Sequence, residues 1–162
     1  MFDTAFGLPL HPLIVHLVVV LLPLASITVL LAAVWPRFRR WAGPLPLGLA
    51  VVGTAAVPVA TQAGEALANT GLGQKPTVAP HAALGELMIW WALALLLAAG
   101  LVFWLHLKTR TVDSNRKPGQ ALVAGIAVFA AVAAVGTVVH VYRVGDSGAS
   151  SVWGGTSFSS TG

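Results

Sequence analysis

Four long apolar runs divide the chain, and short polar segments separate them. The runs cover residues 12–35, 43–60, 82–107 and 120–142. An α-helix rises about 1.5 Å per residue, so roughly 20 residues cross a hydrocarbon core about 30 Å thick. Each run meets this length, the second provided that its helix continues past Pro58. Because the runs are continuous in Leu, Ala and Val, they predict spanning helices and not the alternating strands of a membrane β-barrel.

The basic residues predict how these helices are oriented. The segments that follow the first and third runs hold most of the nine Lys and Arg residues, namely Arg37, Arg39, Arg40, Lys108, Arg110, Arg116 and Lys117. The positive-inside rule places both segments in the cytoplasm and both chain termini on the extracytoplasmic side. Trp35, Trp41 and Trp104 then lie at the inner interface, where an aromatic belt is expected.

Composition supports an integral membrane protein. The chain is 57% hydrophobic and 9% charged, whereas an ordinary soluble domain is about 25% charged. The net charge of +4 falls in short clusters between apolar runs, which indicates membrane topology and no nucleic-acid binding. The chain has no cysteine, which excludes disulfides, thiolate metal sites and thiol catalysis. We therefore expect an all-α, multi-pass four-helix bundle in contact with the lipid bilayer.

The chain is expected to form one domain. Residues 1–144 are predicted to form the four-span bundle, and residues 145–162, rich in Gly and Ser, a flexible tail. Residues 61–80 form the only long connection between predicted spans, with a turn at residues 69–71. The first run has no Lys or Arg before it and exceeds the apolar region of a signal peptide, so we expect it to be retained.

Ionisable side chains gather at the predicted outer ends of the spans. They are His11, His16, His81, His140, Glu65 and Glu86. Such residues are costly within a membrane and therefore indicate a functional site. Each histidine also has a simpler interpretation as an interfacial residue or as a buried side chain bonded to a backbone carbonyl. His106 alone is near the inner end, where its neighbours Trp104 and Lys108 predict an interfacial side chain.

Three functions remain open on these residues. Haem iron takes one or two axial side chains, commonly His, within a bundle able to bury an apolar ring. The first hypothesis is therefore a haem b-binding membrane protein that exchanges electrons with a redox partner or a quinone. The second is a non-haem Zn or Cu site built from imidazoles and a carboxylate. The third is a structural subunit without a cofactor, and a homo-oligomer is also left open.

The depth of each histidine below the outer end of its span predicts which two would bind a haem iron as axial ligands. His16 lies about 6 Å inside the outer end of its span and His140 about 3–5 Å inside, so they come closest to a common depth. His81 is the competing partner, and His11 suits a contact to a propionate or to a ligating imidazole. Glu65 and Glu86 are candidates for a metal ligand or for an acceptor of an imidazole N–H.

Several motifs are similar to those of a known bacterial family. They are HPLIVH at residues 11–16, QAGE at 62–65, PHAALG at 80–85 and VYRVG at 141–145. Together they resemble the small four-helix membrane proteins grouped as domain-of-unknown-function family 2231. The family usually has Phe-Pro after its second histidine, where this chain has Leu17 and Val18, and often Asp where Glu65 stands. The resemblance implies a four-helix fold in a bacterial inner membrane and supplies no established activity.

Overall fold

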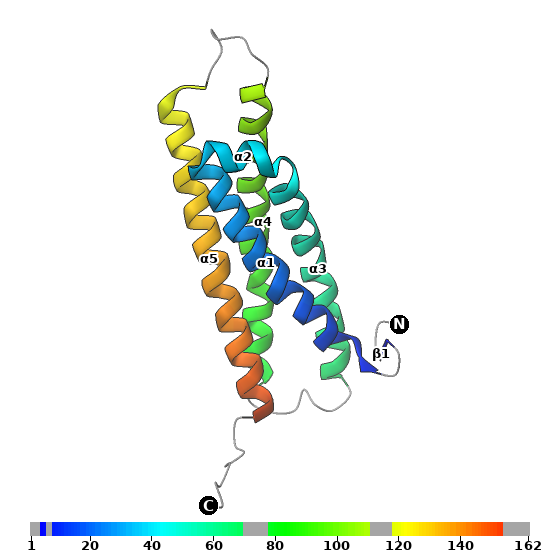
Figure 1. The fold of residues 1–162 in the computed structure, drawn as a ribbon. Helices are drawn as coiled ribbons and strands as arrows, with labels where there is room; N and C mark the ends of the chain where they lie inside the picture. Colours follow the sequence, from blue (N-terminus) through cyan, green and yellow to red (C-terminus); the bar gives the residue numbers. More distant parts are fainter. Residues whose placement is uncertain (1–3, 6–7, 70–77, 111–117, 154–162) are drawn as a thin grey trace, which may run out of the picture.

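Four long helices form the body of the protein. The computed structural model describes residues 4–5, 8–69, 78–110 and 118–153. The long helices are α1 (Leu10–Val34), α3 (Leu45–Ala68), α4 (Val78–Arg110) and α5 (Gln120–Trp153) (Figure 1). All four are long and apolar enough to cross a membrane. The predicted all-α bundle of four spans is therefore confirmed.

Three shorter elements complete the described chain. Helix α2 (Pro36–Ala42) lies across one end of the bundle, between the end of α1 and the start of α3 (Figure 1). It begins at a proline and is followed by Gly43, whose φ of 56° favours glycine. Strands β1 (Thr4–Ala5) and β2 (Leu8–Pro9) pair antiparallel just ahead of α1.

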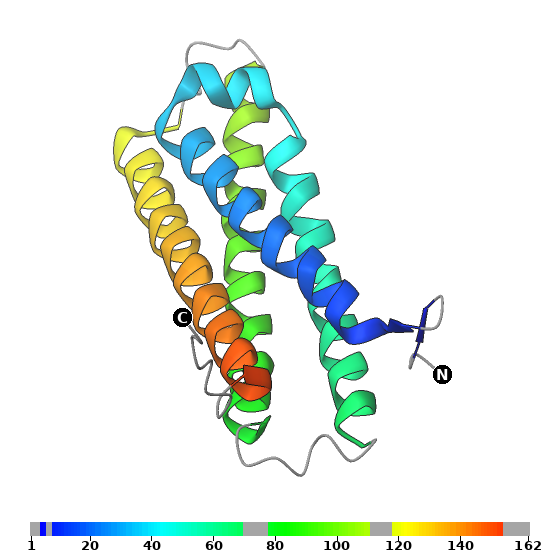
Figure 2. The same cartoon turned by 60° about the horizontal axis from the view of Figure 1, so that its bottom comes forward.

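The long helices run up and down the bundle in turn. Helix α1 packs mainly on α3 and α5, and α4 packs on the same two helices, so α1 and α4 are diagonal neighbours (Figure 2). The start of α1 and the end of α5 consequently lie at the same end. We call this the histidine end. The opposite end, which carries α2 and the end of α4, is called the basic end.

Three helices extend well beyond the predicted spans. Helix α4 runs from Val78 to Arg110, so residues 78–80 of the expected connection are helical. Helix α3 continues through Pro58 to Ala68, so residues 61–68 are helical and not part of a loop. A proline is tolerated in a membrane helix because neighbouring groups satisfy the freed backbone carbonyl. Helix α5 continues to Trp153, so residues 145–153, which were expected to belong to the tail, are helical. Residues 70–71 of the expected turn and residues 154–162 of the tail lie outside the described residues.

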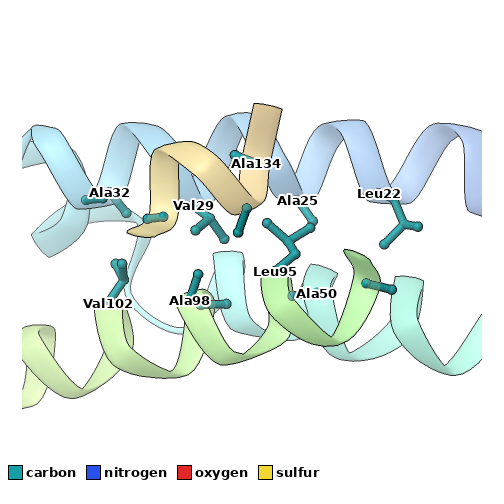
Figure 3. Packing of buried hydrophobic residues seen from close by; sticks show 14 of the residues in the cluster. Leu22, Ala25, Val29, Ala32, Ala50, Leu95, Ala98, Val102 and Ala134 are labelled. Carbon is teal, nitrogen blue, oxygen red and sulfur yellow. The ribbon is translucent and has the colours of Figure 1, made fainter. Parts of the chain in front are cut away.

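Small residues allow the helices to pack closely in the middle of the bundle. Alanines and branched side chains from all four long helices interdigitate there (Figure 3). A Cβ added at Gly136 would lie 1.9 Å from the Trp91 ring, and one at Gly53 would lie 2.8 Å from Leu22 Cδ2. These glycines therefore set the approach of α5 to α4 and of α3 to α1, as small residues commonly do in membrane bundles.

Candidate functional site

A cavity opens at the histidine end of the bundle. Its volume is about 550 Å³ and all four long helices line it, which is within the range of small-molecule and cofactor sites. Most of the lining is apolar or small. The ionisable side chains that line it are His11, His16, Glu65, His81 and Glu86. Five of the six predicted site residues are thus brought to one cavity.

His11 enters the cavity from the first turn of α1 and is held by α3. Its Nδ1 lies 2.9 Å from the carbonyl oxygen of Ala60. A carbonyl only accepts hydrogen bonds, so Nδ1 carries a proton, and in the neutral imidazole the lone pair is then on Nε2. One turn further along α3, a Cβ at Gly64 would lie 2.9 Å from His11 Cε1. Helix α3 therefore supplies both an acceptor and the space for the ring.

His81 enters from the first turns of α4 and is held in the same way by α5. Its Nδ1 lies 3.0 Å from Ser147 Oγ. The serine hydroxyl donates to the carbonyl oxygen of Val144 at 2.9 Å, so towards His81 it acts as an acceptor. The Nδ1 of His81 therefore carries a proton, and in the neutral imidazole the lone pair is then on Nε2. A Cβ at Gly148 would lie 3.1 Å from His81 Cε1.

His11 and His81 form a pair across the cavity. Their ring centroids are 6.4 Å apart and their planes are inclined by 80°. The two rings come from α1 and α4, which are diagonal in the bundle. Each ring is oriented through Nδ1, and each has an Nε2 lone pair that can bind an electrophile or accept a proton. This arrangement is the usual way in which proteins prepare an imidazole for a metal.

The other three ionisable side chains that line the cavity are exposed. His16 donates through Nδ1 to the carbonyl oxygen of Pro12 at 2.6 Å, and its side chain is exposed. Glu65 on α3 and Glu86 on α4 are exposed as well. Within the part of the chain that the structure describes, no three His, Cys, Asp or Glu side chains are close enough to hold one metal ion. The cavity therefore presents an imidazole pair and separate carboxylates.

The remaining two histidines are engaged elsewhere. His140 is buried and donates through Nε2 to the carbonyl oxygen of Leu84 at 2.8 Å, and the described lining of the cavity does not include it. The structure thus does not bring His16 and His140 to one pocket. His106 is 2% exposed and donates through Nδ1 to the carbonyl oxygen of Arg39 at 3.0 Å. It is buried and not interfacial as its neighbours suggest, because α2 folds over it.

Sequence reasoning missed the residues that hold the two rings. Gly64 lies in the QAGE motif, and Ser147 and Gly148 lie in the segment expected to be a flexible tail. The available signal is the spacing of small residues one helical turn apart, at Ala60 and Gly64 and again along residues 145–148.

This architecture defines a multi-pass membrane protein whose four-helix bundle holds an imidazole-lined cavity at one end. The model of the family described as predicted membrane protein (DUF2231) matches residues 7–157. The chain belongs to this family, which confirms the resemblance drawn from its motifs and its location in a membrane. No curated protein and no solved structure matches the chain significantly.

Proposed function

We propose that this chain binds haem b in the cavity at the histidine end, with the imidazoles of His11 and His81 as axial ligands. The observation that supports the proposal is the pair itself: two rings from diagonal helices, each oriented through Nδ1 and each with an Nε2 lone pair. This pair replaces His16 and His140 in the proposal, because the described lining of the cavity does not include His140.

The separation of the rings favours ligands on opposite sides of one ion. A metal–imidazole bond is about 2.0–2.1 Å, so opposed imidazoles have centroids about 6 Å apart, and tetrahedral ones about 5 Å. The centroids of His11 and His81 are 6.4 Å apart. This spacing of the centroids is therefore closer to that of two opposed ligands than to that of two ligands of a tetrahedral zinc.

The surroundings of the pair suit a large, mainly apolar ring. The cavity has a volume of about 550 Å³ and its lining is largely apolar, and four-helix bundles commonly bury haem between facing helices. When bound, haem would supply one-electron transfer. The acceptors Ala60 and Ser147 would fix the tautomer of each ligating ring and raise its basicity.

A non-haem Zn or Cu site is the second candidate. The observation that favours it is that His16, Glu65 and Glu86 line the same cavity as the imidazole pair. A carboxylate that turned towards the pair would supply the third ligand that a catalytic zinc requires. A structural subunit without a cofactor is the third reading, and the experiment below separates all three.

The test is a spectrum of the full-length protein purified from cells supplied with a haem precursor. We expect a reduced-minus-oxidised difference in the visible range and about one haem per chain. His11→Ala and His81→Ala should each reduce bound haem at least tenfold, and His16→Ala and His140→Ala should retain it. Full retention in both of the first two variants would overturn the assignment. A colourless protein that contains stoichiometric Zn or Cu would support the second candidate, and a metal-free one the third.

The positive-inside rule supports an extracytoplasmic location for the cavity, because the basic end would face the cytoplasm. A haem there would exchange electrons with a partner on that side or with a quinone in the bilayer, and would not carry them across it. Topology reporters fused after Arg40 and Gly162 test the orientation. A cytoplasmic signal from the fusion at Gly162 would move the cavity to the cytoplasmic side.

A further inference from the structure

Helix α2 and the residue before it carry a row of aromatic side chains at the basic end. The rings of Trp35 and Phe38 are 6.3 Å apart between centroids, and those of Phe38 and Trp41 are 5.7 Å apart. Trp35 is 53% exposed and Trp41 is 78% exposed. Exposed tryptophans in a membrane protein favour the level of the lipid headgroups. The row therefore indicates that α2 lies in the membrane interface.

Basic side chains lie next to this row. Arg37 and Arg40 are exposed on α2, and at 3.6 residues per turn they follow one another on a side of the helix adjacent to the aromatic row. Helix α4 contacts α2 and ends with Lys108 and Arg110, both exposed. The interface at this end therefore presents a group of positive charges directly beside exposed tryptophans.

Arg39 fixes α2 in this position. It is 6% exposed, and its Nη1 donates to the carbonyl oxygen of Ala32 at 3.2 Å, near the end of α1. Its own carbonyl oxygen accepts the hydrogen bond from His106 Nδ1 at 3.0 Å. These two hydrogen bonds hold α2 against α1 and α4. The side chains of Arg37 and Arg40 are therefore kept on the exposed side of α2.

We propose that α2 and the end of α4 form a binding surface for anionic phospholipid headgroups, with Arg37 and Arg40 contacting the lipid phosphates and Trp35 and Trp41 lying among the headgroups. Charge complementarity supports this occupant, since juxtamembrane basic clusters attract the anionic lipids of the cytoplasmic leaflet. Guanidinium groups also bind phosphate oxygens in a bidentate manner. The surface is at the end opposite the cavity and does not depend on the proposed haem.

The test uses the full chain in vesicles of equal parts phosphatidylglycerol and phosphatidylcholine, with bromine on the acyl chains of one lipid at a time. Bromine quenches nearby tryptophan fluorescence, and the difference between wild type and Trp41→Phe isolates the Trp41 signal. We expect labelled phosphatidylglycerol to quench this signal more than labelled phosphatidylcholine, and added salt to reduce the difference.

Single substitutions give the size of the effect. Arg40→Gln should lower the relative binding constant for phosphatidylglycerol about fivefold, and the double variant Arg37→Gln/Arg40→Gln about 25-fold. Arg143→Gln is the matched control, because it removes one exposed positive charge at the histidine end, and it should leave the constant within twofold. Equal quenching by the two lipids in the wild type, an unchanged double variant, or an equal effect of Arg143→Gln would each overturn the proposal. The haem spectrum should be the same in all these variants, so this surface and the cavity are tested separately.

Discussion

The two ends of the bundle hold histidine in opposite ways. At the basic end, His106 is buried, stacks on Phe103 with centroids 5.8 Å apart, and donates to the backbone of Arg39. At the histidine end, His11 and His81 are oriented by equally good hydrogen bonds through Nδ1 but face a cavity. The first arrangement ties α2 to the bundle, and the second leaves Nε2 available for chemistry.

The difference lies in how each end is filled. At the basic end α2 covers the bundle, and Val102 and Leu105 are buried beside His106. At the histidine end, Gly85 and Gly145 line the cavity, and a Cβ built on either one meets nothing within 4 Å. The cavity is therefore open partly because these two positions have no side chain. A histidine's role in this fold follows from the packing around it and not from its neighbours in sequence.

The largest effect on stability is expected from His106→Ala. The substitution removes a buried ring and its hydrogen bond to the carbonyl oxygen of Arg39, which keeps only the N–H of Gly43 as a donor. The loss should lower the free energy of unfolding by about 3 kcal/mol. Denaturation in detergent, followed by circular dichroism, measures the change. Haem content per folded chain should stay at the wild-type value. If His106→Ala kept the wild-type stability but lost haem, His106 would be a ligand and not a structural residue, which would contradict this comparison of the two ends.

His140→Ala separates a structural histidine from a ligating one at the histidine end. The bond from His140 Nε2 to the carbonyl oxygen of Leu84 joins α5 to α4, so its loss should cost about 2 kcal/mol of stability. Val139→Ala is the control, because Val139 is 52% exposed on the same helix and its truncation should cost well under 1 kcal/mol. Loss of haem from His140→Ala at unchanged stability would restore His140 as a ligand.

The fold could be predicted from the sequence because four apolar runs are sufficient to define four spans. The ends of the helices could not. Thr61, Gln62 and Gly64 read as a loop after Pro58, yet residues 61–68 continue α3, because the helix satisfies its own backbone where a loop would need other partners.

The candidate site could be predicted only in part, for a similar reason. Counting residues places the histidines at one end of the bundle, since depth depends only on helical rise. Which rings meet depends on the rotation of each helix about its axis and on which ring nitrogen is engaged. His16 and His140 share a depth, but His140 is not among the described residues that line the cavity, whereas His81 lies beside His11 with centroids 6.4 Å apart.

Gly64→Ala tests whether α3 holds the ring of His11 in position. The added methyl would lie 2.9 Å from His11 Cε1 and 3.0 Å from Nδ1, so the ring must shift. We expect the dissociation constant for haem to rise about tenfold, as for other changes that disturb the orientation of a metal ligand. Gly48→Ala on the same helix is the control, because its Cβ would meet nothing within 4 Å. An equal effect of both substitutions would assign the loss to α3 as a whole.

Ser147→Ala should give the smallest change in haem affinity, and it tests whether Ser147 raises the basicity of the His81 imidazole. The substitution removes the Ser147 hydroxyl as an acceptor for His81 and leaves its hydrogen bond to the backbone of Val144, so the ring becomes a somewhat weaker donor to a metal. We expect haem affinity to fall about threefold, within the usual range for one hydrogen bond. The midpoint potential should rise, because a less basic imidazole stabilises the ferric state less. Ser147→Thr keeps a hydroxyl and should restore the potential, while Ser150→Ala, at an exposed position of the same helix, should leave it unchanged. A potential that stays constant in Ser147→Ala would show that His81 is not a ligand whose basicity this serine controls.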